Sequence, residues 1–156
     1  SMYTLWNCRE AIGDDDFILL ESDIIYSKNA ITELQENEHP DIMLITPVTK
    51  FQDQYYVEYD EYGTLTSYST NKAEINAKGE LVGIHKFSNA FYKAMCVNYA
   101  SKVEEKPKLG YEYEILSMAQ SGNRVYVLNE KGLYWYEIDD PDDLAYAEKN
   151  VLPHLK

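Results

Sequence analysis

Two aspartates stand directly after apolar stretches that we expect to form strands of one sheet. Asp23 follows the run 17–20, and Asp139 follows the run 133–138. Ligands of open α/β sheets bind at the carboxyl ends of the strands, so the two carboxylates are expected to approach each other. Converging carboxylates repel unless a cation lies between them, and Mg²⁺ suits because it takes oxygen ligands and keeps waters and substrate phosphates. The spacing is therefore compatible with a Mg²⁺ site formed by Asp23 and Asp139.

A purely structural interpretation of the same aspartates stays open at this point. Strand-to-helix turns favour Asp, so Asp23 fits a turn position, and Asp139 or Asp140 fits the N-cap of a helix that begins at Pro141. Under this interpretation the chain is a non-catalytic α/β interaction domain.

The elements that would position these residues follow from periodicity and capping signals. We expect strands at 17–20, 42–48, 81–87, 125–128 and 133–138, a hairpin from 55–59 and 65–68, and helices at 1–12, 28–37, 88–99, 111–120 and after 140. Strands alternating with helices predict one α/β domain over 1–156, with a Rossmann-like, mixed but mostly parallel sheet and helices on both faces. The hairpin adds a small antiparallel pair of strands to this sheet.

Composition excludes several classes of protein. The 27 acidic and 14 basic residues give a net charge of −13, which argues against nucleic acid or an anionic membrane as a partner. The two cysteines, Cys8 and Cys96, show no metal-ligand spacing. Neither a membrane-spanning apolar run nor a signal-peptide pattern is present, so a cytoplasmic location is the default expectation.

Four stretches, in the right order, resemble nucleotidyltransferases with the cytidylyltransferase fold. The resemblance covers DDDFILLESDIIY (14–26, a central strand and metal-binding turn), GELVGIHKFS (79–88, a middle strand) and GLYWYEIDDPDDLAYAE (132–148, the late strand and final helix). It extends to SMYTLWNCREAI (1–12), which is similar to a helix of the narrower subgroup that couples CTP to phosphocholine or 2-aminoethylphosphonate. The implied fold is the nucleotidyltransferase, GT-A-like fold.

The resemblance implies an enzyme of the EC 2.7.7 type whose catalytic and metal-binding residues are Asp23 and Asp139. In such proteins Mg²⁺ bridges the α-phosphate of CTP and the phosphate or phosphonate of the acceptor, whose oxygen attacks the α-phosphorus in line while pyrophosphate leaves. Positioning and charge neutralisation are then the protein's contribution. Glu21, which lies beside Asp23, is interpreted as a surface residue or a neighbour of the ligands.

The family's opening strand and glycine-rich phosphate-binding loop have no counterpart here. The seven glycines do not cluster, so the chain looks like the C-terminal two thirds of the domain. We therefore expect the CTP site to lie mostly in the missing N-terminal part, and the isolated chain to be inactive or nearly so. The oligomeric state stays open, with a homodimer among the alternatives.

The acceptor of the subgroup carries an ammonium group, which favours aromatic and acidic partners. The residues predicted to bind it are Tyr3, Trp6, Glu112 and Tyr113, and Lys86 is predicted to neutralise the phosphonate. The acids favour 2-aminoethylphosphonate slightly over phosphocholine. A sugar-1-phosphate nucleotidyltransferase of the same fold is the alternative enzyme.

Overall fold

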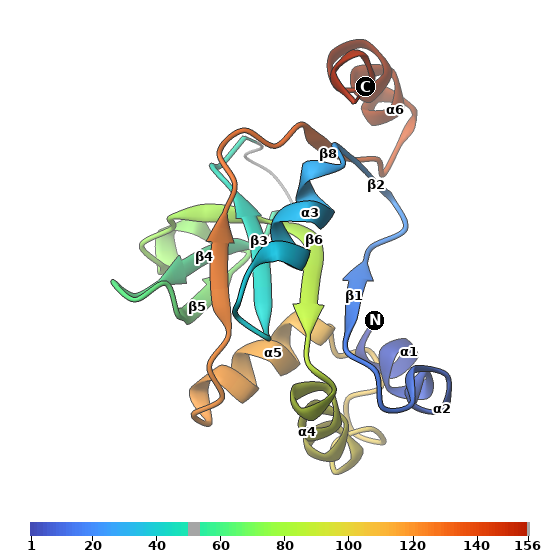
Figure 1. Ribbon diagram of the computed structural model, residues 1–156, viewed down its shortest axis with the longest axis vertical. Coiled ribbons are helices and arrows are strands. Elements are labelled where there is room, and N and C mark those ends of the chain that lie inside the picture. Colours follow the sequence, from blue (N-terminus) through green and yellow to red (C-terminus); the bar gives the residue numbers. More distant parts are fainter. Residues whose placement is uncertain (50–53, 156) are drawn as a thin grey trace.

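The computed structural model describes residues 1–49 and 54–155 and shows a six-stranded sheet covered by helices (Figure 1). The sheet order is β5 (Leu65–Ser69), β4 (Tyr56–Tyr59), β6 (Gly79–Phe87), β3 (Ile42–Thr46), β7 (Tyr126–Asn129), with β1 (Phe17–Leu20) also paired to β6. β1, β3 and β4 each run antiparallel to β6, and β7 runs parallel to β3. Most strands therefore share one direction, which confirms the predicted mixed α/β sheet, although β6 makes most neighbouring pairs antiparallel.

β6 changes partner along its length. Its first residues pair with β4 and its last with β1, while the register against β3 shifts between Met43 and Ile45. Gly83 lies within this shift with φ 78°, a left-handed conformation that favours glycine. The irregularity bends β6 where the end of β1 meets it, as β-bulges near binding sites do.

Helices cover both faces of the sheet. On one face pack α1 (Met2–Asn7), α4 (Asn89–Ala100) and α5 (Tyr111–Gln120), which gather at the lower end of Figure 1; α2 (Arg9–Ile12) follows α1. On the other face lies α3 (Asn29–Glu36). Alternate residues of β3 enter the two cores, since Met43 and Ile45 join the first and Ile42 and Leu44 the second.

Local signals explain where the helices begin. The Ser88 hydroxyl accepts the Phe91 N–H at 3.2 Å and so caps α4, as predicted. Asp140 caps α6 (Pro141–Asn150) by accepting the N–H groups of Asp142 and Asp143. The cap of the last helix is therefore Asp140 rather than Asp139.

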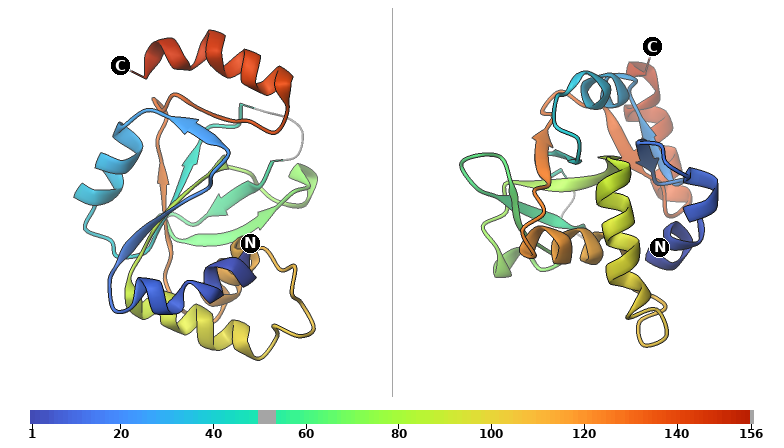
Figure 2. Two further views of the ribbon diagram at one scale, coloured as in Figure 1. Left: turned by 90° about the vertical axis from the view of Figure 1, so that its right-hand side faces the viewer. Right: turned by 60° about the horizontal axis from the view of Figure 1, so that its bottom comes forward.

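The predicted strand 133–138 differs from the expectation. It is shortened to β8 (Trp135–Glu137), and it leaves the main sheet to pair antiparallel with β2 (Ile24–Tyr26), which was not predicted. This two-stranded ribbon lies between the sheet and α6, and Figure 2 shows α6 at the periphery of the molecule. Short 3₁₀ turns at Lys72–Glu74 and Leu152–His154 complete the elements.

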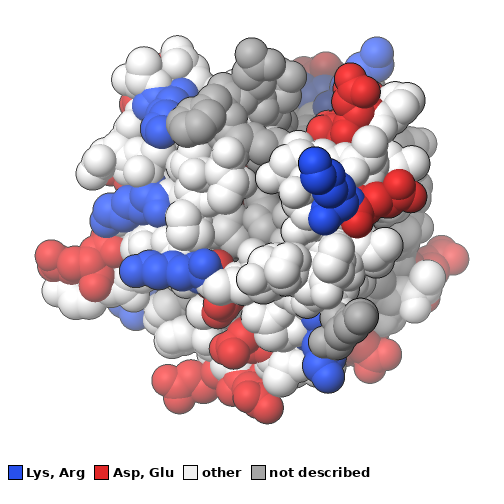
Figure 3. Space-filling model, turned by 90° about the horizontal axis from the view of Figure 1, so that it is seen from above, with Lys and Arg blue, Asp and Glu red and all other residues white. Residues whose placement is uncertain are grey.

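No helix in the described residues is long and apolar enough to cross a bilayer. On the face shown in Figure 3, acidic and basic side chains lie interspersed.

Candidate functional site

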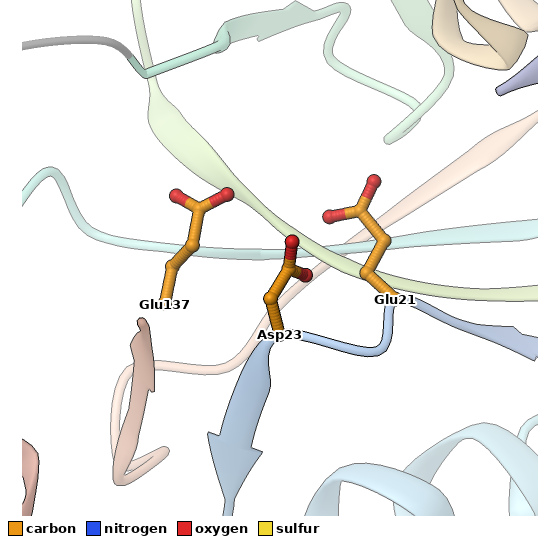
Figure 4. A group of neighbouring side chains, drawn as sticks. All are labelled: Glu21, Asp23 and Glu137. Carbon is orange, nitrogen blue, oxygen red and sulfur yellow. The ribbon is translucent and has the colours of Figure 1, made fainter. Parts of the chain in front are cut away.

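Three carboxylates converge where β1 ends. Glu21 directly follows β1, Asp23 directly precedes β2, and Glu137 is the last residue of β8. One oxygen from each lies within 4.8 Å of the others, and the side chains point into a common space (Figure 4). The ribbon creates this proximity, because Ile24 is paired with Glu137 and the Ile138 N–H donates to the Asp23 carbonyl oxygen at 2.8 Å.

The three carboxylates fit a hard divalent cation. Ligand bonds of ~2.1 Å allow Mg²⁺ to join oxygens up to ~4.2 Å apart, and the longer bonds of Ca²⁺ span slightly more. The three oxygens lie within 4.8 Å of one another, so small side-chain rotations would bring them into this range. A site made only of oxygen ligands also favours Mg²⁺ over the softer transition metals, which prefer nitrogen or sulfur ligands.

Two pockets meet at these carboxylates. The larger, of about 430 Å³, lies on the α1 side and is lined by the three acids together with Ser1, Thr4, Leu5, Cys8, Leu19, Leu20, Ser22 and Tyr111. The smaller, of about 70 Å³, is lined by Glu21, Gln54, Tyr55, Leu81, Val82, Gly83, Trp135 and Glu137. Glu21 and Glu137 therefore face both pockets, so there is space on either side of the carboxylates.

Glu21 is a half-buried member of the group rather than the surface neighbour that we expected. Its backbone N–H donates to the Gly83 carbonyl oxygen at 3.0 Å, and its Oε1 accepts the Tyr111 hydroxyl at 2.7 Å. Burial raises the pKa of Glu21, and the charges of Asp23 and Asp139 add to the rise, whereas the tyrosine hydrogen bond opposes it. A cation beside Glu21 would relieve this unfavourable charge.

Asp139 is not one of the three grouped residues. It is exposed, its backbone N–H donates to an Asp143 side-chain oxygen at 3.2 Å, and its charge is close enough to affect Glu21. The pairing of Asp23 with Asp139 on one ion therefore stays a prediction. Glu137 was missed, although it stands two residues before Asp139 and so shares its side of an extended segment.

The residues predicted to bind the ammonium group separate into two sets. Tyr3 and Trp6 lie together on α1, with ring centroids 6.1 Å apart, and the Arg9 guanidinium stacks 3.6 Å from the Trp6 ring centroid. Glu112 and Tyr113, on α5, lie instead beside the hairpin tyrosines Tyr55 and Tyr68. Trp6 therefore already has a cationic partner close in the chain.

Glu112 lies near a cluster of three tyrosine rings. The centroids of Tyr55, Tyr68 and Tyr113 are 5.2 to 6.2 Å apart in their three pairs, and the charge of Glu112 raises the pKa values of Tyr55 and Tyr68 in addition to burial. Glu112 is only 6% exposed, and its Oε2 has no hydrogen-bond partner in the described part of the chain. Burial raises its own pKa. Its own backbone N–H and the positive charge of the chain's N-terminus act in the opposite direction.

Lys86 lies away from the carboxylates. It pairs with Ile18 and Ile42 in the sheet, and its ammonium donates to the Asn37 carbonyl oxygen at 2.8 Å, toward the end where β1 and β3 begin. This placement disfavours the predicted contact between Lys86 and an acceptor phosphonate held near Asp23.

Comparison with known proteins links this fold to nucleotidyltransferases. No protein-family model matches the chain. Among solved structures, the inositol-1-phosphate CTP transferase from T. maritima matches with a TM-score of 0.76 at 14% identity, over 100% of this chain and 62% of that protein. The CTP:phosphocholine cytidylyltransferase LicC from Streptococcus pneumoniae matches with a TM-score of 0.71 at 14% identity, over 94% and 61%. At such identities the shared property is the fold, and this chain spans about three fifths of the length of both proteins.

Proposed function

We propose that the chain is the acceptor- and metal-binding part of a nucleotidyltransferase that transfers a cytidylyl group from CTP to a small phospho- or phosphono-amine. The observation that carries the proposal is the group of Glu21, Asp23 and Glu137, which opens onto two pockets at the end of β1 in a fold shared with two solved CTP-dependent transferases. Acids at the carboxyl end of a strand are where an open α/β sheet binds its ligands.

The three carboxylates would hold Mg²⁺, with Asp139 as an additional nearby acid. When bound, the ion supplies charge neutralisation for the two phosphate groups that must approach each other during transfer. The contribution of the chain itself is to orient the acids, through the ribbon of β2 and β8, and to provide the 430 Å³ pocket beside them. No side-chain nucleophile is needed for such a direct displacement.

The acceptor is proposed to extend from the carboxylates toward the hairpin tyrosines. Tyr55 lines the small pocket together with Glu21 and Glu137. Next to Tyr55 lie the rings of Tyr68 and Tyr113 and the Glu112 carboxylate. Glu112 with its free Oε2 offers a charge-assisted hydrogen bond to an ammonium N–H. Because a primary ammonium has N–H donors and a quaternary one has none, this arrangement favours 2-aminoethylphosphonate over phosphocholine.

A phosphorylated sugar or polyol is the second candidate acceptor. The larger pocket carries the hydroxyl side chains of Ser1, Thr4 and Ser22, which are groups that a polyhydroxylated acceptor would use. The T. maritima protein is named for inositol 1-phosphate.

The direct test is pyrophosphate release by the protein at its full encoded length. CTP is offered with 2-aminoethylphosphonate, phosphocholine, inositol 1-phosphate or glucose 1-phosphate. We expect Mg²⁺-dependent turnover that is fastest with 2-aminoethylphosphonate and abolished in Asp23→Asn. The isolated chain 1–156 is expected to show little or no turnover, and robust activity of that chain would contradict the proposed division of the CTP site.

A metal titration tests the site without requiring activity. Free Mn²⁺ measured by electron paramagnetic resonance reports binding to the chain 1–156. We expect Asp23→Asn and Glu137→Gln to weaken binding, whereas Asp142→Asn, which removes an acid in the first turn of α6, serves as the control. Equal loss of affinity in all three variants would indicate diffuse attraction to an acidic surface and would argue against a site.

A further inference from the structure

We propose that Tyr111 is a positioning residue that, together with His85 and Gly83, fixes the Glu21 carboxylate for cation binding. This inference rests on the proposed function, because it concerns the same group of acids. Two elements reach Glu21: β6, which carries Gly83 and the buried His85, and α5, which carries Tyr111.

Gly83 provides the space in which Glu21 lies. A Cβ atom at Gly83 would lie 2.2 Å from Oε2 and 2.8 Å from Cδ of Glu21, distances that real Cβ atoms do not reach. The φ of 78° at Gly83 disfavours other residues independently. The Glu21 side chain therefore lies directly against the backbone of the β6 irregularity, and the backbone bond from Glu21 N–H to the Gly83 carbonyl ties the two segments together.

Tyr111 fixes the rotation of the carboxylate. Its hydroxyl donates to Glu21 Oε1 at 2.7 Å, and the tyrosine is only 4% exposed. Burial raises the pKa of Tyr111, so its hydroxyl keeps its proton and stays a donor. With one oxygen held in this way and the other against Gly83, the carboxylate faces Asp23 and Glu137, as Figure 4 shows.

His85 completes the chain of hydrogen bonds. Its Nε2 lies 3.2 Å from the Tyr111 hydroxyl oxygen, and the residue is fully buried. Since the tyrosine proton is directed to Glu21, the hydroxyl oxygen accepts, and His85 must carry its proton on Nε2. Its Nδ1 has no partner among the described residues, as expected for the unprotonated nitrogen of a neutral ring. Burial lowers the pKa of His85 to about 3, which keeps the ring neutral.

The rings of His85 and Tyr111 pack against each other, and His85 also stacks on Phe87, but this packing does not require their polar atoms. A leucine would fill the position of His85 without leaving a polar atom unpaired, and a phenylalanine would fill that of Tyr111. Hydrogen bonds to ligating carboxylates typically alter metal affinity by ~10–100-fold when they are removed. We therefore expect the hydrogen bonds from His85 to Tyr111 and from Tyr111 to Glu21 to affect the affinity for a metal ion rather than the stability of the fold.

The test compares Mn²⁺ affinity in matched variants of the chain 1–156. Tyr111→Phe is expected to raise the Kd for Mn²⁺ by ~10-fold or more. Tyr99→Phe is the control, because it removes the hydroxyl of a buried tyrosine that bonds the Lys106 carbonyl oxygen instead, and its Kd should stay within about twofold of the wild type. His85→Leu should weaken Mn²⁺ binding without lowering the Tm, and His85→Gln, whose amide N–H reaches as Nε2 does, should restore it.

The outcomes separate this inference from the proposed function. Binding that is lost in Asp23→Asn but unchanged in Tyr111→Phe overturns the positioning role alone. Equal losses in Tyr111→Phe and Tyr99→Phe, each accompanied by a lower Tm, also overturn it, because they indicate a purely structural effect. Absence of any binding that depends on Asp23 overturns the metal site and the inference together.

Discussion

Glu112 and Glu114 stand two positions apart in the first turn of α5, and both are buried, at 6% and 0% exposure. Glu114 faces α4, where it accepts a hydrogen bond from Asn98, and it forms an ion pair at 2.9 Å with Lys102, which follows that helix. Glu112 lies near the hairpin tyrosines, and its Oε2 has no hydrogen-bond partner among residues 1–49 and 54–155. Two positions correspond to ~200° around a helix, which explains the different surroundings.

We interpret the difference between the two glutamates as the difference between a structural acid and a proposed binding acid. Burying a charge is unfavourable unless it is paired, and Glu114 meets that condition within the chain. Glu112 is compensated only in part, by its own backbone N–H and the charge of the N-terminus, and its Oε2 has no partner among the described residues. Its burial therefore lowers the stability of the protein unless a cationic ligand completes its surroundings. We interpret the unpaired glutamate as the one that serves the acceptor.

Removing the partner of Glu114 should have the largest effect. Lys102→Met would leave a fully buried carboxylate without its ammonium, and we expect the free energy of unfolding to fall by about 3 kcal/mol. Urea denaturation measures this change. The Glu114→Gln variant removes the charge as well as the pair and should be milder. A Lys102→Met variant that loses less than about 1 kcal/mol would remove the contrast between the two glutamates.

Neutralising Glu112 should instead affect binding. In the full-length protein we expect Glu112→Gln to raise the KM for an ammonium acceptor by ~30-fold, about 2 kcal/mol, with the stability unchanged or increased. Steady-state pyrophosphate assays provide the KM, with an acceptor lacking an amine as the control substrate. An equal effect on both acceptors would contradict an ammonium contact.

The neighbouring aspartates before α6 allow the same contrast on a smaller scale. Asp140→Ala removes the N-cap and should lower the free energy of unfolding by about 1 kcal/mol while leaving Mn²⁺ affinity unchanged. Asp139→Ala should do the reverse, if this acid joins the ion. Calorimetric Tm values and Mn²⁺ titrations of both variants decide the assignment, and a cap-like loss of stability in Asp139→Ala would contradict it.

Elements with local signals could be predicted from the sequence. The helix 111–120, the Ser88 cap and the hairpin each depend on residues close in the chain, and the structure confirms all three. Asp23 at the end of the first strand was recognised for the same reason, since an acid after an apolar run is a local pattern.

Glu137 and the hairpin tyrosines could not be identified in this way. Glu137 reaches Asp23 only because β8 pairs with β2, a three-residue strand more than 100 residues earlier, and no local pattern specifies that pairing. Tyr55 and Tyr68 lie beside Tyr113 of α5 because β5 packs on that helix and pairs with β4, whereas the predicted aromatic partners Tyr3 and Trp6 lie on α1. Such choices between aromatic residues are decided by tertiary packing.

The pH dependence of stability should show the smallest difference between the two glutamates. Burial raises the pKa of Glu112 above its ordinary value of 4.5, so the folded state retains this proton to higher pH than the unfolded state. The stabilisation from this group is therefore complete below pH 4.5 and is lost as the pH rises through the folded pKa.

Urea denaturation from about pH 3 to 8 should show that Glu112→Gln gains stability relative to the wild type as the pH rises. The difference between the two curves isolates Glu112 from Glu21, whose pKa is also raised by burial and which titrates in both proteins. Parallel curves would mean that Glu112 ionises in the folded state as it does in water. The proposed binding of a cationic group by this carboxylate would then be contradicted.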